Sequence, residues 1–158
     1  MSFFSSQHSS PASHHRLLRI LLVEDSPADI ELPRQALAEA EIETEVTVCP
    51  DGEAAGSYLR REGDHANAPR PDLILLDLNL PKKDGRELLV EIKRDPDLSL
   101  IPVVVLTTSA SEDDVLHAYR EHVNCYIRKP VRLQDFINVV RSIDEYWLSI
   151  VTLPPSPV

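Results

Sequence analysis

Reactive side chains follow four apolar segments of the sequence, each at the point where the segment ends. They are Glu24 and Asp25 after 20–23, Asp77 after 73–76, Thr107 after 103–106, and Arg128 and Lys129 after 125–127. A carboxylate at the end of a buried strand is costly unless a cation or a hydrogen-bond donor meets it there. The recurrence therefore predicts that acid, hydroxyl and amine groups meet at one edge of one sheet.

Carboxylates held close together repel one another, and a divalent cation relieves that repulsion. Because the candidate ligands Glu24, Asp25 and Asp77 are all oxygen donors, they suit Mg²⁺ rather than Zn²⁺. With the metal bound, one carboxylate can act as a nucleophile toward a phosphoryl group and form an aspartyl phosphate. Lys129 and Thr107 would supply the cation and the donor that the charged phosphoryl oxygens need.

Strand-like and helix-like segments alternate along the chain. The expected strands are 19–23, 44–49, 72–76, 103–106 and 124–127, and the expected helices are 27–40, 53–61, 84–94, one from 111, and 132–150. This alternation predicts an α/β fold, a (βα)5 doubly wound parallel five-stranded sheet with right-handed crossovers. Ligands of such sheets bind beyond the carboxyl ends of the strands. Pro33 falls inside the first helix, where a proline is expected to kink the helix or cost about 3 kcal/mol.

Composition limits the classes of function. The chain has 158 residues, 42% of them apolar, which suits one domain with an aliphatic core. Its formal net charge of -10 argues against a nucleic-acid surface. It lacks a run long enough to span a membrane and a signal-peptide layout, so we expect a cytoplasmic protein. We expect a flexible arm over 1–16, a domain over 17–150 and a Pro-rich tail over 151–158.

Four motifs carry a family resemblance. They are Leu21-Leu22-Val23-Glu24-Asp25, the segment from Leu76-Asp77 to Asp84-Gly85, the segment from Pro102 to Ser109, and Tyr126-Ile127-Arg128-Lys129-Pro130. Together they resemble the signatures of response regulator receiver domains over about residues 19–150. The resemblance implies a flavodoxin-like fold with strand order 2-1-3-4-5. Cys49 and Cys125 would then lie on opposite edge strands, which excludes a disulfide between them.

The resemblance also implies a role for each residue of the site. Asp77 would accept a phosphoryl group from a histidine kinase, with Mg²⁺ held by Glu24, Asp25, Asp77 and the main-chain carbonyl of Asn79. Thr107 and Lys129 would contact the phosphoryl oxygens, and Tyr126 would turn inward as Thr107 moves. An ordinary half-buried strand aromatic is the alternative for Tyr126.

Further details are similar to one branch of the family, the small stand-alone regulators that partner bacterial phytochrome kinases. These details are the long loop before Pro71, the Leu78–Lys82 and Leu106–Ser109 segments, and a last helix ending Tyr146-Trp147-Leu148. Pro33 departs from the usual unbroken first helix of the family, which bears on the helix face expected to dock the kinase and not on the phosphorylation pocket.

Output is expected to run through protein contact, because no DNA-binding motif follows Ile150. The last helix carries more apolar residues than one buried stripe needs, which often marks an interface. We expect a homodimer through the fourth helix, fifth strand and fifth helix. Its candidate interface residues are Val131, Leu133, Tyr146, Trp147 and Ile150. Trp147 folded back on the core is the alternative.

Three other functions compete with signalling by a phosphorylated receiver. An aspartate-nucleophile phosphatase usually carries Asp-x-Asp on its first strand, whereas here Leu78 and Asn79 follow Asp77. We therefore expect no enzyme activity beyond slow self-dephosphorylation. A binding module that works without phosphorylation would not need the full set of acids, Thr107 and Lys129. A phosphate sink or a phosphorelay intermediate uses the same pocket and stays open.

Overall fold

The computed structural model describes residues 17–80, 82–107, 125–128 and 132–152. Its strands are β1 (Leu18–Val23), β2 (Thr44–Cys49), β3 (Leu73–Asp77), β4 (Val103–Thr107) and β5 (Cys125–Arg128). Its helices are α2 (Pro27–Glu39), α3 (Gly52–Arg60), α4 (Gly85–Arg94) and α6 (Leu133–Thr152), with short 3₁₀ turns η2 (Gly63–His65) and η3 (Leu98–Leu100).

The strands form one parallel sheet in the order β2-β1-β3-β4-β5. This confirms the predicted α/β fold and the order of its first four strands. β5 lies on the outer side of β4, where Arg128 pairs with Thr107. Two register pairs align the carboxyl ends of three strands. Val23 of β1 lies beside Leu76 of β3, and Asp77 of β3 lies beside Leu106 of β4. The strands β1, β3 and β4 therefore end at the same level.

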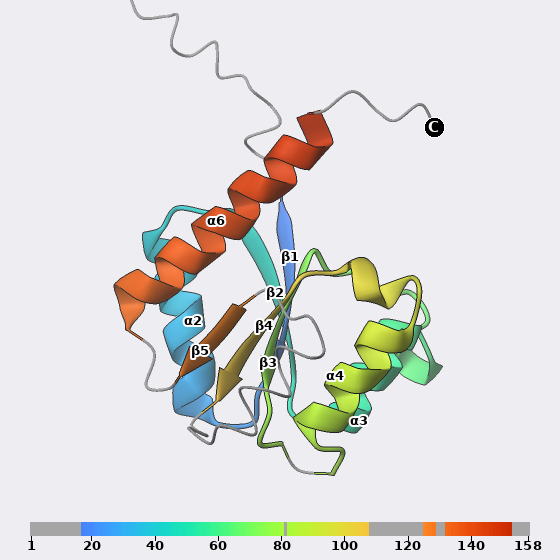
Figure 1. The fold of residues 1–158 in the computed structure, drawn as a ribbon. Helices are drawn as coiled ribbons and strands as arrows, with labels where there is room; N and C mark the ends of the chain where they lie inside the picture. The colour runs from blue at the N-terminus through green and yellow to red at the C-terminus, as the bar shows by residue number, and fades with distance from the viewer. Residues whose placement is uncertain (1–16, 81, 108–124, 129–131, 153–158) are drawn as a thin grey trace, which may run out of the picture.

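Two hydrophobic layers cover the sheet, with α2 and α6 on one face and α3 and α4 on the other (Figure 1). Successive residues of β3 alternate between these layers: Leu73 and Leu75 join the α2/α6 core, and Ile74 and Leu76 join the α3/α4 core. All four side chains are fully buried. The near-continuous apolar strands follow from this burial on both faces.

The expected helix that contains Pro33 forms as α2, with Pro33 buried beside Ala36 and Leu37 on its inner face. The structure differs from the sequence-based expectation elsewhere. The expected loop 62–70 contains the 3₁₀ turn η2, and α6 extends to Thr152 rather than Ile150. The expected helix from 111, the arm over 1–16 and most of the tail lie outside the described residues.

No helix in the described ranges is long and apolar enough to cross a membrane.

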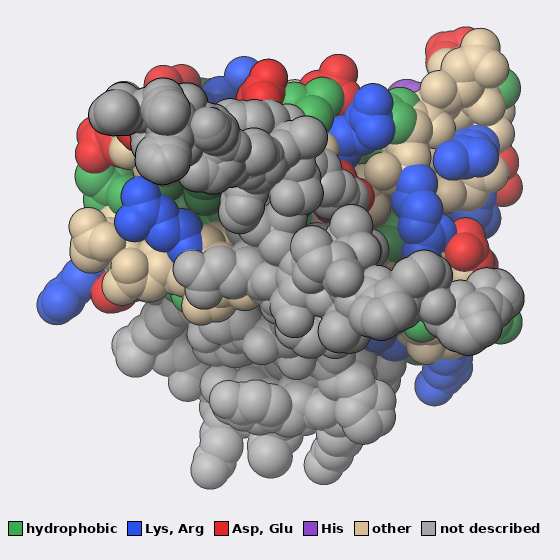
Figure 2. All heavy atoms as spheres, turned by 90° about the horizontal axis from the view of Figure 1, so that it is seen from above, with side chains coloured by type: hydrophobic (Ala, Val, Ile, Leu, Met, Phe, Trp, Pro, Cys, Tyr) green, Lys and Arg blue, Asp and Glu red, His purple; other side chains and the backbone are tan. Residues whose placement is uncertain are grey.

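Figure 2 views the molecule from the edge of the sheet where the strands begin. Among the described side chains visible there, Lys and Arg are interspersed with Asp and Glu and form no continuous basic patch.

Two glycines let backbone segments approach closely beside the end of β3. The N–H of Gly85 donates to the carbonyl of Leu78 at 3.0 Å. A Cβ at Gly85 would lie 2.3 Å from the carbonyl oxygen of Asp77, and one at Gly52 would lie 2.2 Å from that of Lys83. Both contacts are shorter than any side-chain carbon tolerates, so these positions require glycine.

Gly85→Ala is expected to destabilise the fold by about 3 kcal/mol or more, because the new methyl group overlaps a main-chain oxygen that cannot move freely. Urea unfolding measures the change. Gly56→Ala is the matched control, because the atoms nearest to its Cβ would belong to the side-chain end of Arg60, at 3.0 Å or more, rather than to the main chain. There the better helix propensity of Ala is expected to leave stability unchanged or raise it by about 0.5–1 kcal/mol. Equal stability of the two variants would contradict the packing argument.

Candidate functional site

Three carboxylates meet at the edge where β1 and β3 end. Oxygen atoms of Glu24, Asp25 and Asp77 all lie within 4.8 Å of one another. Glu24 and Asp77 are buried, with exposed fractions of 1% and 5%, whereas Asp25 is exposed. The structure thus brings together the acidic residues that the sequence predicted to meet.

Backbone hydrogen bonding positions Glu24. Its N–H donates to the carbonyl of Cys49 at 3.0 Å, which extends the β1–β2 ladder by one residue. Its Oε2 atom accepts from the N–H of Ser26 at 3.3 Å. Ser26 is also the N-cap of α2, and its hydroxyl accepts weakly from the N–H of Asp29 at 3.5 Å. The positive end of α2 therefore lies next to the cluster and offsets part of its negative charge.

Asp77 is the last residue of β3, so its position follows from the sheet register. Its Oδ1 atom accepts from the N–H of Asn79 at 3.0 Å, which orients the carboxylate. Asn79 itself is exposed and begins the loop that leads to α4. This arrangement keeps Asn79 directly beside the acidic cluster.

The remaining predicted site residues are only partly described. Thr107 ends β4 and Tyr126 lies in β5, but their side chains lie outside the described atoms, as does Lys129 entirely. Among the candidate interface residues, Leu133 packs partly against the α2/α6 core. Val131 and the side chains of Tyr146, Trp147 and Ile150 are outside the described set. Their roles stay predictions.

A third buried acid, Asp51, which the sequence pattern did not single out, lies close to this edge. Asp51 caps α3, with its Oδ1 atom 2.8 Å from the N–H of Ala54. Its Oδ2 atom lies 3.6 Å from Nζ of Lys82, a residue in the left-handed backbone region with a φ of 62°. The Pro50-Asp51-Gly52 sequence by itself indicates only a turn. The ion pair depends on two loops meeting, which local sequence does not reveal.

Cys49 lies one strand away from the acids, at the end of β2, and is a buried free thiol. Burial raises the pKa of the Cys49 thiol to about 11, and the negative charge of Asp51 adds to the effect. The folded protein therefore keeps the thiol proton at pH values where the unfolded chain, with the ordinary thiol pKa of 9.0, releases it. This linkage makes stability fall as the pH rises through roughly 9 to 11.

Cys49 of the folded protein is expected to react with iodoacetamide at pH 8 about 100-fold more slowly than in urea, because fewer molecules carry the thiolate. Peptide mass spectrometry follows Cys49 separately from Cys125. The same rate in folded and unfolded protein would contradict this assignment.

Comparison with known proteins places this geometry in a family. The family described as "Response regulator receiver domain" matches residues 20–141. "Response regulator Rcp1" of Synechocystis sp. is 56% identical over 135 residues, covering 85% of this chain and 92% of Rcp1.

Two solved structures share the fold at high identity. One is the "Phosphorylated Cyanobacterial Phytochrome Response Regulator RcpA", at 57% identity and a TM-score of 0.75, covering 89% of this chain and 100% of that one. The other is "the Mn(2+)-bound form of response regulator Rcp1", at 54% identity and a TM-score of 0.74, covering 87% and 99%. The family match spans both strand ends that carry the acidic cluster, and the chain belongs to the response regulator receiver domain family.

Proposed function

We propose that this protein accepts a phosphoryl group from a histidine kinase on Asp77 and signals through the phosphorylated form. The observation that carries the proposal is the convergence of Glu24, Asp25 and Asp77, whose oxygens lie within 4.8 Å of one another. The proposal is supported by 56% identity to a response regulator and by three acids at one sheet edge, which provide a candidate acceptor carboxylate with candidate metal ligands beside it.

The acids suit Mg²⁺. All three acids offer only oxygen donors, and two of the side chains, Glu24 and Asp77, are buried. Sites with such hard donors bind Mg²⁺ or Mn²⁺ in preference to Zn²⁺. Glu24, Asp25, Asp77 and the carbonyl of Asn79 would hold the ion. When bound, it would neutralise charge on the carboxylates and on the incoming phosphoryl oxygens.

The transfer itself exchanges one bond for another. A carboxylate oxygen of Asp77 attacks the phosphorus atom of a phosphohistidine, the O–P bond forms, and the P–N bond to the imidazole breaks with its electron pair left on the nitrogen. The N–H of Asn79, 3.0 Å from Oδ1, holds the carboxylate in place for attack. Thr107 and Lys129 would bind the phosphoryl oxygens from the ends of the neighbouring strands.

The kinase partner is proposed to be a bacterial phytochrome. Support comes from RcpA, which is described as a cyanobacterial phytochrome response regulator and is 57% identical to this chain. Phosphorylation would shift the conformations of Thr107 and Tyr126, and the signal would be passed on by contact with another protein. The protein would act as a cytoplasmic homodimer. We propose no enzymatic turnover beyond slow self-dephosphorylation. A phosphate sink or relay intermediate is the second candidate, since it needs the same site.

Intact mass spectrometry after incubation with a small phosphoryl donor and Mg²⁺ tests the proposal. We expect the wild-type chain to gain one labile phosphoryl group and to lose this ability when the metal is chelated. A wild-type chain that gains none with Mg²⁺ or Mn²⁺ would favour a binding module that works without phosphorylation.

A further inference from the structure

We propose that a chain of ion pairs running from Lys83 through Glu91 to Arg60 positions the loop between β3 and α4, and thereby sets the metal affinity of the acidic site. The inference rests on the proposed function, because this loop carries the Asn79 carbonyl assigned to the metal. We call Lys83, Glu91 and Arg60 the loop clamp, and they act as positioning residues.

The first contact of the loop clamp is its tightest. Nζ of Lys83 lies 2.8 Å from both carboxylate oxygens of Glu91, which is in the middle of α4. The side chain of Lys83 is only 19% exposed and that of Glu91 is 38% exposed, so water screens this ion pair less than a fully exposed one. This ion pair therefore attaches Lys83, and with it the loop, directly to α4.

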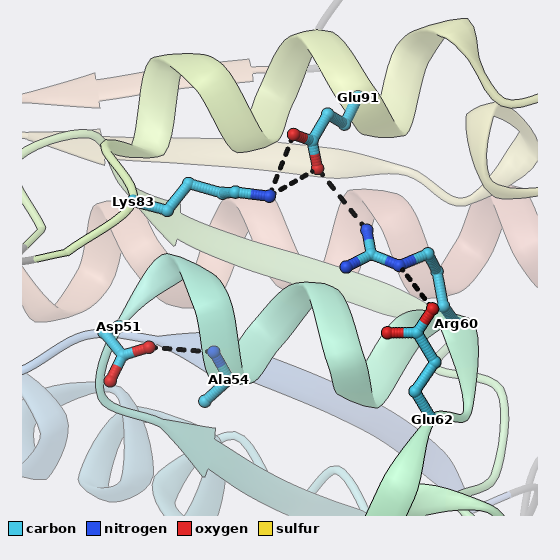
Figure 3. Close-up of polar contacts among 6 residues, drawn as sticks. All are labelled: Asp51, Ala54, Arg60, Glu62, Lys83 and Glu91. Carbon is cyan, nitrogen blue, oxygen red and sulfur yellow. Dashed lines mark hydrogen bonds and ion pairs between the residues drawn. The ribbon is translucent and has the colours of Figure 1, made fainter.

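The loop clamp continues from α4 to α3. Glu91 also accepts from Nη1 of Arg60 at 3.4 Å, and Nε of Arg60 contacts Glu62 at 3.1 Å. Figure 3 shows the four side chains as one run of alternating charge that links the loop to α4 and to the carboxyl end of α3. A shared partner makes the two pairs interdependent, because Glu91 serves both cations.

Contacts at the start of α3 hold the same loop from its other side. Gly52 packs against the main chain of Lys83 so closely that a Cβ there would lie 2.2 Å from the Lys83 oxygen. Asp51 lies 3.6 Å from Nζ of Lys82, whose φ of 62° is costly for a residue with a side chain. A strained backbone conformation persists only when surrounding contacts stabilise it. The loop clamp is one of these stabilising contacts.

The held loop begins at the acidic site. Asn79 donates to Asp77, and the carbonyl of Leu78 accepts from Gly85, so both ends of the loop are tied to the end of β3. Lys83 is thus held four residues from Asn79, whose N–H contacts Asp77. Freeing Lys83 should loosen the main chain that is assigned to the metal.

Isothermal titration with Mn²⁺ tests the loop clamp in Lys83→Met, Glu91→Gln and the double variant. We expect each to raise the Kd for Mn²⁺ by about 10-fold, the lower end of what outer-shell partners of a metal site contribute. The double variant should match the single ones, because the two residues act as one unit. Hydrogen exchange of the metal-free protein should show faster exchange of the amides of 79, 80 and 82–84.

Charge alone predicts the opposite result for Lys83→Met. Removing this cation makes the protein more negative, which would tighten Mn²⁺ binding, whereas the loop clamp predicts weaker binding. Glu45→Gln is the matched control for Glu91→Gln, because Glu45 pairs with Arg19 on the exposed β1–β2 surface, with Nε of Arg19 at 3.1 Å. It loses the same charge and is expected to leave the Kd unchanged.

The outcomes separate the loop clamp from the metal site. Unchanged or tighter Mn²⁺ binding by Lys83→Met, with binding by the wild-type chain intact, would overturn the loop clamp and leave the proposed function standing. A wild-type chain that binds no Mn²⁺ would overturn the metal site, and the claim that the loop clamp sets metal affinity falls with it. Unchanged exchange of the loop amides in the variants would overturn the positioning of the loop itself.

Discussion

A chain carrying both Glu24→Gln and Asp25→Asn is expected to bind Mn²⁺ at least about 100-fold more weakly than the wild-type chain, beyond the loss typical of an outer-shell partner. The substitutions leave amide oxygens in place of two of the three gathered carboxylates, and neutral oxygens attract a divalent ion far less. Gln at position 24 keeps an oxygen able to accept from the N–H of Ser26. The fold should therefore survive, and isothermal titration measures the lost affinity.

The same substitutions should not lower the stability of the metal-free protein. Two like charges disappear from a cluster in which Glu24 and Asp77 are buried, so the repulsion that the folded state carries is reduced. Thermal unfolding without metal provides this comparison. Mn²⁺ affinity equal to that of the wild-type chain would show that the ion does not bind at Glu24 and Asp25.

Asp77→Asn is expected to abolish phosphoryl acceptance, a complete loss rather than a reduction. A carboxamide lacks the anionic oxygen that attacks phosphorus. Asn keeps the shape of Asp and an oxygen that can accept from the N–H of Asn79, so the local structure is retained. Intact mass after incubation with a small phosphoryl donor and Mg²⁺ should show the unmodified chain only.

Asp72→Asn is the matched control, because Asp72 lies just before the opposite end of the same strand, where its Oδ2 atom accepts from the N–H of Arg19 at 2.9 Å. We expect this variant to gain the phosphoryl group as the wild-type chain does. Labelling of Asp77→Asn at the wild-type level would mean that another side chain is the acceptor.

The convergence of the acids was predictable from sequence because it follows from local patterns and one rule of topology. Apolar runs locate the strands, and parallel strands end at a common edge. With Val23 beside Leu76, the residues that follow each of them, Glu24 and Asp77, must lie close together. The inward faces of the helices were predictable for the same reason: Leu88, Leu89 and Ile92 of α4 are buried as their spacing indicates.

The contacts that join α3 to α4 and to the β3–α4 loop were not predictable, because they connect residues far apart in the sequence. Arg60 and Glu91 are 31 positions apart, and both occur in stretches that contain other charges. The left-handed conformation of Lys82 has no local signal either, since glycine or asparagine usually marks such positions. Only the packing of α3 against the loop, which depends on Gly52, brings these residues together.

Pro33 shows tertiary packing overriding a local preference. A proline in mid-helix removes one hydrogen bond and is expected to bend or break the helix. Here α2 remains continuous, and Pro33 is buried together with Ala36 and Leu37. Burial of this face against the rest of the α2/α6 layer offsets the local cost, which the sequence of the helix alone does not reveal.

The most direct test of the central claim is chemical mapping of the phosphoryl group in the wild-type chain. Borohydride reduces an aspartyl phosphate to homoserine and leaves free carboxylates unchanged, so peptide mass spectrometry then identifies the acceptor residue. If Asp77 is the acceptor, homoserine appears at position 77 alone, and only when Mg²⁺ was present during phosphorylation. Homoserine at Asp25, or a phosphoryl group retained on another side chain with Asp77 intact, would contradict the account.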